Sequence, residues 1–170
     1  MPYRAAVLTV SDRGSRGETV DTSGPAVAAL LAGAGFEVLA QAIVPDDPAE
    51  VASTLRRWAD DAGYALVVTT GGTGLTARDL TPEATLEVID TRVPGMEEAM
   101  RAAGLAHTPM AMLSRGVAGV RGRTLIVNLP GSERAARENL ETVLPVLTHA
   151  CDSLAGDGGA ARVSHEGESR

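Results

Sequence analysis

The chain has 170 residues, of which 22% are charged and 44% hydrophobic, and a formal net charge of −7, a composition typical of a single globular domain that buries its own core. No apolar run approaches the roughly 18 residues of a membrane span and the first residues lack a signal-peptide pattern, so we expect a soluble, cytoplasmic protein with no membrane partner. The acidic balance and an aromatic content of only 2% argue against a nucleic-acid partner.

The types of basic residue and the single cysteine exclude several kinds of catalytic and binding site. No lysine occurs in the sequence, which excludes a P-loop lysine, a Schiff base and a lysine general base. Any bound phosphate must therefore be held by loop amides, arginines and a metal ion. The only cysteine, Cys151, excludes an internal disulfide and a cysteine-based zinc site.

The first predicted strand covers residues 4–10, an apolar run rich in β-branched side chains. It ends at Ser11 and Asp12, and polar residues at the carboxyl end of a buried strand are where open α/β sheets place their ligands. An ordinary turn or helix cap explains this pair almost as well. Residues 14–21 are expected to form a polar loop.

A helical pattern follows over residues 22–34, with Thr22 or Ser23 as the expected N-cap. Gly35 ends this helix, and residues 37–44 predict the second strand.

Two adjacent carboxylates, Asp46 and Asp47, stand between prolines after the second strand. Asp47 is expected to cap a helix over residues 48–62, in which Trp58 faces the core. No structural role is then expected for Asp46. Its position at the carboxyl end of a strand would let it face the glycine-rich loop at residues 71–74.

The most informative stretch is residues 65–86, ALVVTTGGTGLTARDLTPEATL. An apolar run at 65–68 predicts a short buried strand. Three glycines within residues 71–74 permit a sharp turn and let bare N–H groups approach a ligand closely. Thr81 as N-cap and Pro82 at the first helical position predict a helix start, so the stretch is typical of an anion-binding corner.

Arg78 and Asp79 lie between the glycine turn and this helix start. Two other interpretations stay open: the glycines serve only a strand-to-helix turn, or residues 72–77 with Asp90 form the dinucleotide fingerprint of an NAD-dependent oxidoreductase. The fingerprint requires a helix that begins inside the glycine run, whereas Pro82 predicts a later start.

The chain after the glycine stretch continues to alternate helices and strands. Arg121 and Gly122 predict a hairpin, and hence one antiparallel strand. Ser132 is expected to cap a last helix that reaches residue 154, and the glycine-rich tail 155–170 is predicted to be disordered. The other elements predicted here are helices at 82–89 and 96–103, a turn at 90–95, and strands at 112–120 and 123–130.

These elements predict one α/β domain over residues 1–154, a three-layer αβα sandwich with a mostly parallel sheet and one antiparallel strand. The carboxyl ends of parallel strands lie along one edge of a sheet, so polar residues that follow those strands should converge on a single cleft. The residues concerned are Ser11, Asp12, Asp46, the loop 71–79 and the segment 128–132.

The motif TTGGTGLTARDLTPEAT resembles the signature of the molybdenum cofactor biosynthesis family that contains MogA, MoaB and the corresponding domain of gephyrin. LTVSDR, PDD and MLSRGVAGVRGRTLIVNLPGS extend the resemblance over nearly the whole chain except the tail. The resemblance implies a molybdopterin-binding fold and adenylation of molybdopterin, as substrate, by ATP with Mg²⁺, which releases pyrophosphate. It also implies a homotrimer or a hexamer, and a molybdenum-insertion protein that receives the product.

The same resemblance implies a set of site residues. Asp46 and Asp79 would be the catalytic acidic residues and the Mg²⁺ ligands, and Arg78 or Arg115 would neutralise phosphates. A non-catalytic, MoaB-like protein that binds molybdopterin is the alternative. The residues that would bind the pterin or the nucleotide are Ser11, Asp12, Thr70, Gly71, Gly72, Thr73, Gly74, Arg78, Ser114, Arg115, Asn128, Pro130, Gly131 and Ser132.

Overall fold

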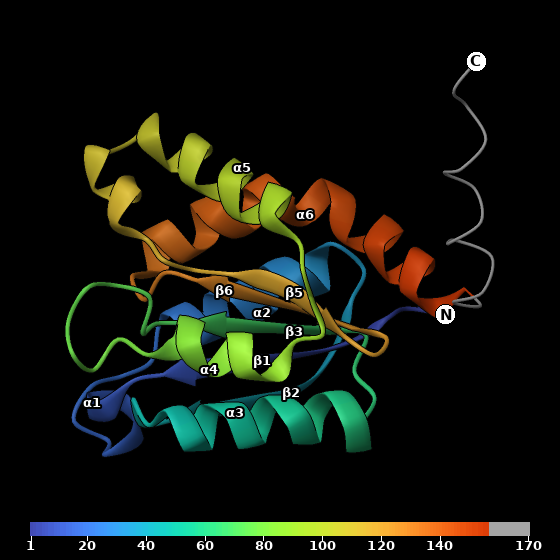
Figure 1. Cartoon of the computed structure of the whole chain (residues 1–170), viewed down its shortest axis with the longest axis horizontal. Helices are drawn as coiled ribbons and strands as arrows, with labels where there is room; N and C mark the ends of the chain where they lie inside the picture. The colour runs from blue at the N-terminus through green and yellow to red at the C-terminus, as the bar shows by residue number, and fades with distance from the viewer. Residues whose placement is uncertain (157–170) are drawn as a thin grey trace.

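The computed structural model describes residues 1–156 and is built around one six-stranded sheet (Figure 1). The strands are β1 (Arg4–Val10), β2 (Glu37–Val44), β3 (Leu66–Thr70), β4 (Thr91–Arg92), β5 (Ala118–Arg121) and β6 (Thr124–Leu129). Their order across the sheet is β2-β1-β3-β6-β5-β4. The strands β2, β1, β3 and β6 are parallel, and β5 is antiparallel to both of its neighbours. The predicted mostly parallel sheet with one antiparallel strand is confirmed.

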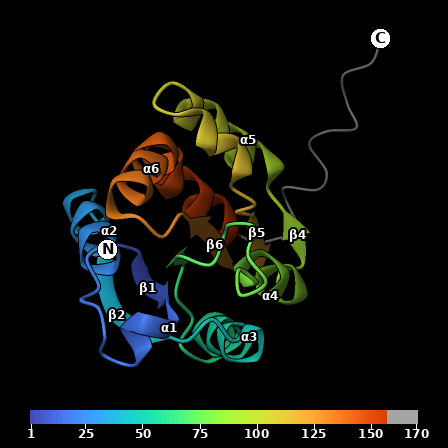
Figure 2. The ribbon, with the colours of Figure 1, turned by 90° about the vertical axis from the view of Figure 1, so that its left-hand side faces the viewer.

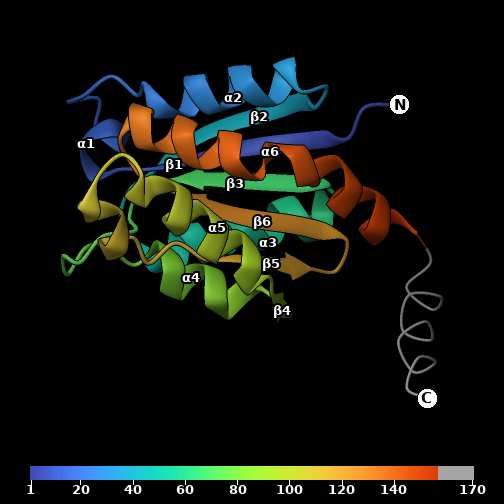
Figure 3. The same cartoon turned by 90° about the horizontal axis from the view of Figure 1, so that it is seen from above.

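Helices cover both faces of this sheet and complete three layers (Figures 1 and 3). The helices α2, α5 and α6 pack on one face, and α3 with α4 packs on the other. The helical segments are α1 (Asp12–Ser15), α2 (Ser23–Gly33), α3 (Pro48–Arg56) with the π-helical extension η1 (Arg57–Asp61), α4 (Thr81–Val88), α5 (Pro94–Leu105), the 3₁₀ helix η2 (Pro109–Leu113) and α6 (Glu133–Ala155).

The core follows from the two-residue period of the central strands. In β1, Ala5 and Val7 face the layer of α2 and α6, whereas Ala6 and Leu8 face α3 and α4, and all four are fully buried. Burial on both faces explains why β1, β3 and β6 are nearly continuous apolar runs, whereas the outer strand β2 alternates between exposed and half-buried residues.

The carboxyl ends of β1, β3 and β6 lie side by side at one edge of the sheet, which Figure 2 shows end-on. Thr9 pairs with Thr70, and Thr70 pairs with Leu129. This register brings α1, the glycine loop after β3 and the start of α6 to the same end of the domain.

Thr22 holds the predicted N-cap position of α2 without a side-chain bond, whereas the predicted cap at Thr81 is wrong. The side chain of Thr22 makes no capping hydrogen bond; instead Asp21 accepts from the N–H of Gly24, because its carboxylate reaches back over the first turn of α2. Thr81 is the first residue of α4 instead of its N-cap, and Leu80 holds the cap position without a side-chain bond. Asp47 caps α3 through the N–H of Ala49, as expected.

Several predicted boundaries also differ. Residues 12–15, which overlap the start of the loop predicted over 14–21, form α1, and Ser11 caps it by accepting from the N–H of Gly14. The strand predicted over 112–120 is shorter in the structure and begins only at β5. Its first two residues belong to the helix η2, which Thr108 caps. The turn predicted over 90–95 contains β4, and α5 extends the helix predicted over 96–103 at both ends.

The end of α6 at Ala155 agrees with the predicted last helix to within one residue. The predicted disorder of the tail concerns residues 157–170 above all, which lie outside the described residues. Within residues 1–156, no helix combines the length and the apolar character that crossing a bilayer requires.

Candidate functional site

The glycine loop, residues 71–74, is shaped by two close approaches of the backbone. Gly71 and Gly72 have φ angles of +93° and +68°, which L side chains rarely adopt. A Cβ at Gly71 would lie 2.3 Å from the carbonyl oxygen of Val10, and one at Gly72 would lie 2.2 Å from Thr81 Oγ1. Because α4 begins at Thr81 and not inside the glycine run, the loop lacks the geometry of a dinucleotide fingerprint.

The N–H groups of this loop are available to a ligand. The N–H of Gly71 donates to Leu129 O at 3.1 Å and so anchors the loop to the end of β6. Among the described residues, the N–H groups of Gly72, Thr73 and Gly74 donate to no protein acceptor. Successive free N–H groups in a turn of this kind suit an anion.

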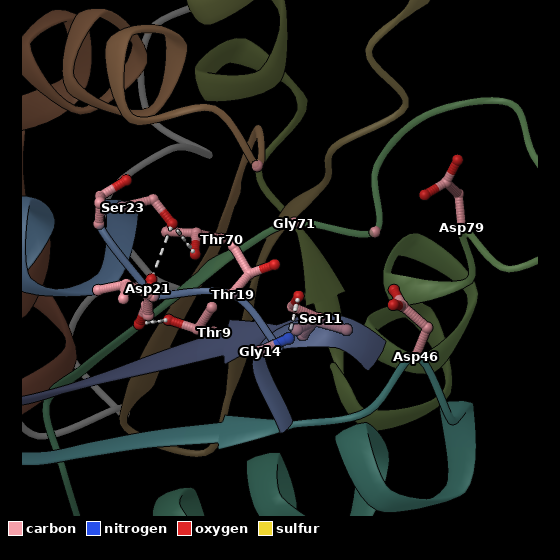
Figure 4. A pocket seen from close by; sticks show the side chains of 15 residues that line it. Thr9, Ser11, Gly14, Thr19, Asp21, Ser23, Asp46, Thr70, Gly71 and Asp79 are labelled. Carbon is pink, nitrogen blue, oxygen red and sulfur yellow. Dashed lines mark hydrogen bonds between the residues drawn. The ribbon is translucent and has the colours of Figure 1, made fainter. Parts of the chain in front are cut away.

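A cavity of about 330 Å³ opens on one side of the glycine loop (Figure 4). Carboxylates line it, with Asp46 coming from the end of β2 and Asp79 from the loop that precedes α4. The predicted site residues that reach this first cavity are Ser11, Asp46, Thr70, Gly71, Gly72, Asp79 and Gly131.

Asp12, Asp46 and Arg78 are joined at the rim of the first cavity. The N–H of Asp12 donates to Asp46 Oδ2 at 2.9 Å, and the N–H of Asp46 donates to Asp12 Oδ1 at 3.0 Å. Arg78 donates to both oxygens of Asp12, at 2.8 and 3.0 Å, which lowers the pKa of that carboxyl. Arg78 thus ties the loop before α4 to the end of β1.

The Asp46 carboxyl has the opposite shift. Burial raises the pKa of Asp46; the N–H of Asp12 opposes this effect, and the negative charges of Asp12 and Asp79 add to it. Any cation that approached Asp46 and Asp79 would relieve their repulsion.

The donor set of Asp46 and Asp79 fits Mg²⁺. Within the described residues, Oδ1 of each carboxylate accepts no hydrogen bond, whereas Asp79 Oδ2 accepts from Thr76 and Asp46 Oδ2 from Asp12. Mg²⁺ binds through one or two carboxylates together with substrate phosphates and water. Residues 1–156 contain no cluster of three or more acidic, His or Cys ligands. Binding of Mg²⁺ through two carboxylates and substrate phosphates does not require such a cluster.

A second cavity of about 400 Å³ lies on the other side of the same loop. Its walls are mainly apolar and include Met100, Met110 and Leu113 from α5 and η2. The predicted site residues that reach this second cavity are Thr73, Gly74, Ser114, Pro130 and Ser132. The predicted residues are therefore divided between two cavities with the glycine loop as a common wall, where the sequence predicts a single cleft.

Arg115 is bound to the protein at each of its guanidinium nitrogens. Nε donates to Gly74 O at 2.8 Å, Nη2 donates to Asp79 O at 2.6 Å, and Nη1 forms an ion pair with Glu83. The backbone N–H of Arg115 also donates to Thr73 O at 3.0 Å. Arg115 thus holds two carbonyls of the glycine loop and one carbonyl of the segment that follows it.

Asn128 lies in the interior and lines neither cavity. It is 1% exposed, and its amide group donates to Thr69 Oγ1 and Thr85 Oγ1 at 3.0 Å each. Its Oδ1 accepts from the N–H of Val117. The geometry gives Asn128 a role in joining β6 to β3, α4 and the start of β5.

The first cavity also contains Thr9, Asp21 and Ser23, which sequence reasoning did not select. Asp21 and Ser23 belong to the segment Asp-Thr-Ser-Gly at the start of α2, which reads as ordinary capping chemistry. Thr9 lies inside an apolar strand, and the only feature of the sequence that could have marked it as a site residue is its hydroxyl near the carboxyl end of β1.

Comparison with known proteins identifies relatives of this chain. A model of the family described as "Probable molybdopterin binding domain" matches residues 6–149. The molybdopterin adenylyltransferase of Helicobacter pylori strain J99 is 41% identical over 153 residues, which are 89% of this chain and 87% of that protein. A crystal structure of the molybdopterin biosynthesis enzyme MoaB from Thermus thermophilus superposes with a TM-score of 0.86 at 58% identity, covering 91% of this chain and 97% of that one.

Some relatives are much longer than this chain. Gephyrin of Dictyostelium discoideum is 42% identical over 154 residues, which are 85% of this chain but 21% of that protein. Across three such relatives the matched region spans between 21% and 50% of the relative's length. The match thus covers one part of those proteins.

Proposed function

This chain belongs to the family described as probable molybdopterin binding domain, and from that membership we propose that it transfers the adenylyl group of ATP to molybdopterin. The adenylyltransferase of Helicobacter pylori, similar over most of both chains, supports this activity. In the proposed reaction the terminal phosphate of molybdopterin attacks the α-phosphorus of ATP. A new P–O bond forms, the bond to the β-phosphate breaks, and pyrophosphate leaves.

The observation that carries the proposal is the glycine loop as a common wall of two unlike cavities. The first is polar and holds Asp46 and Asp79, which suits a nucleotide with its phosphates. The second is largely apolar with a few hydroxyls, which suits an organic ring system such as a pterin. Both substrates can then direct a phosphate at the same loop.

Catalysis in this arrangement needs no protein nucleophile, because the phosphate of molybdopterin is itself the nucleophile. The protein has to hold the two phosphates in line and to stabilise the charge that develops between them. The N–H groups of Gly72, Thr73 and Gly74, which donate to no acceptor among the described residues, would bind these phosphates. Arg78 can exchange Asp12 for a phosphate, since both offer oxygen pairs to its guanidinium.

Asp46 and Asp79 would hold Mg²⁺ through the Oδ1 atoms that accept no bond among the described residues. When bound, Mg²⁺ supplies neutralisation of the nucleotide phosphates. Arg115 would keep Asp79 in position, because it holds the carbonyl of that residue.

The proposal is tested by measuring pyrophosphate release by the purified protein with Mg-ATP, in the presence and absence of molybdopterin. We expect release only when molybdopterin is present, because the phosphate of molybdopterin is the nucleophile of the proposed reaction and the sequence offers no lysine to hold a triphosphate alone. Equal release with and without molybdopterin would show that water accepts the adenylyl group, with AMP as the product, and would contradict the proposal.

A non-catalytic molybdopterin-binding protein is the second candidate. The observation that favours this candidate is the similarity to MoaB from Thermus thermophilus, at 58% identity. Binding of molybdopterin with no adenylation, whichever divalent metal is supplied, would favour this candidate over the enzyme.

The cellular setting follows from the proposed substrates and from the resemblance. We place the reaction in the cytoplasm, where ATP is available. A homotrimer or hexamer, and transfer of the adenylated product to a molybdenum-insertion protein, complete the proposal. Size measurement by light scattering tests the assembly.

A further inference from the structure

Four side chains form a hydrogen-bonded group in the first cavity, and only one of them, Thr70, belongs to the binding residues that the resemblance implies. The Asp21 carboxylate accepts from Thr9 Oγ1 at 2.7 Å, from Ser23 Oγ at 3.4 Å and from the N–H of Gly24 at 3.0 Å. Ser23 Oγ lies 2.9 Å from Thr70 Oγ1. We call Thr9, Asp21, Ser23 and Thr70 the acceptor cluster.

The direction of these hydrogen bonds decides what the acceptor cluster can bind. A carboxylate only accepts, so Thr9 and Ser23 point their hydroxyl hydrogens at Asp21. Ser23 and Thr70 share a shorter hydrogen bond, which either hydroxyl can donate. The Asp21 carboxylate thus places acceptor oxygens and a negative charge at the cavity wall, which suits uncharged hydrogen-bond donors of a ligand and repels phosphate.

The acceptor cluster lies beside the phosphate end of the same cavity. Thr70 directly precedes Gly71, and Figure 4 shows Asp46 and Asp79 on one side of Gly71 and the cluster on the other. In a nucleotide, the group attached to the α-phosphate is the sugar, whose hydroxyls are uncharged donors. A nucleotide with its α-phosphate at the glycine loop therefore brings its sugar to the cluster.

We propose that the acceptor cluster binds the ribose hydroxyls of the nucleotide and that Asp21 selects ribonucleotides over deoxynucleotides. The inference rests on the proposed function, which puts the α-phosphate at the glycine loop. Capping of α2 does not account for the cluster. Asp47 caps α3 through the N–H of Ala49 alone among the described residues, whereas Asp21 also gathers two hydroxyls at the cavity wall.

The test measures nucleotide affinity by calorimetry with Mg²⁺ for ATP, 2′-deoxy-ATP, 3′-deoxy-ATP and ITP. ITP lacks the amino group of adenine, which is the other donor that the cluster could accept. The variants are Asp21→Asn and, as a matched control, Asp47→Asn, which makes the same change at a cap outside both cavities. Asparagine still caps a helix, so α2 should remain folded, and urea unfolding checks this.

Wild-type protein should bind at least one deoxy analogue about tenfold more weakly than ATP, the usual effect of a lost hydrogen bond to a charged group. ITP should bind like ATP. In Asp21→Asn the ratio between ATP and the deoxy analogue should fall close to one, whereas Asp47→Asn should keep the wild-type ratio.

The inference is overturned if wild-type protein binds ATP and both deoxy analogues equally, or if Asp21→Asn keeps the ratio. Selective loss of ITP binding would show that the acceptor cluster binds the base of the nucleotide, and this result would also overturn the inference. If Asp21→Asn unfolds, the affinities of wild-type protein for the nucleotide analogues still test the inference. Sugar discrimination without pyrophosphate release refutes the proposed function alone, whereas release without discrimination refutes this inference alone. Failure to bind any nucleotide refutes both.

Discussion

Gly72 and Gly74 belong to the same loop but differ in what a methyl group would meet. At Gly72 the φ angle is +68° and the added Cβ would lie 2.2 Å from Thr81 Oγ1, a buried hydroxyl that has no hydrogen-bond partner among the described residues. At Gly74 the φ angle is not in the left-handed region, and the added Cβ would lie 2.8 Å from Asp79 Oδ2, at the end of a side chain that can move.

The two alanine substitutions should therefore separate stability from activity. Gly72→Ala should lower the free energy of unfolding by about 1 kcal/mol or more, because of the positive φ and the clash. Gly74→Ala should cost less stability but displace the Asp79 carboxylate and reduce turnover. Urea unfolding and pyrophosphate release measure the two effects. If Gly74→Ala kept full turnover, the orientation of Asp79 would not matter to the reaction.

The segment between β3 and α4 owes its shape to a side chain from a distant part of the chain. Arg115 holds the carbonyls of Gly74 and Asp79 as well as Glu83. Arg121 makes a comparable set of bonds elsewhere, with the carboxylate of Asp60 and the carbonyl of Val88. The two arginines thus differ mainly in whether they hold a cavity wall.

We expect Arg115→Lys to lower kcat about tenfold or more, because lysine keeps the charge but cannot hold two carbonyls and a carboxylate at once, and small misplacements of a catalytic group are costly. Arg121→Lys should change the melting temperature to a similar extent without changing kcat. A rise in KM for ATP at constant kcat would instead mean that Arg115 contacts a substrate phosphate, as the sequence resemblance implies.

Asp12 and Asp46 contribute to the stability of the whole domain with opposite signs. Arg78 lowers the pKa of Asp12, so its contribution is present above the unfolded pKa of about 3.9 and is lost as the pH falls through its lower folded value. Burial raises the pKa of Asp46, so its contribution is present below about 3.9 and is lost as the pH rises through its folded value.

At pH 7 the two asparagine variants should therefore shift the melting temperature in opposite directions. Asp12→Asn should lower it, whereas Asp46→Asn should leave it unchanged or raise it, since the amide removes a desolvated charge and can still accept from the N–H of Asp12. Turnover of Asp46→Asn should fall about tenfold or more. Thermal unfolding between about pH 2 and pH 7 checks the signs, because the Asp12 contribution is lost only below about pH 3.9. A larger loss of stability in Asp46→Asn than in Asp12→Asn would make Asp46 a structural residue.

The sequence by itself determined the features that depend on neighbouring residues. Apolar runs predicted the parallel strands, Asp47 predicted the start of α3, and the hairpin at Arg121 and Gly122 predicted the antiparallel strand. Because parallel strands end at a common edge, the same patterns also predicted that the glycine loop and Asp46 would lie near one another. Those predictions needed only periodicity, capping and the rules of sheet topology.

Only the tertiary structure decided which partner each polar side chain has. Arg115 binds carbonyls 36 and 41 residues away instead of solvent, and Asn128 joins Thr69, 59 residues away, in the interior. The acceptor cluster depends in the same way on the approach of Ser23 to Thr70. Local patterns do not contain these contacts, because a hydrogen bond depends on positions to within a few tenths of an ångström, and those positions are set by how the strands and helices pack together.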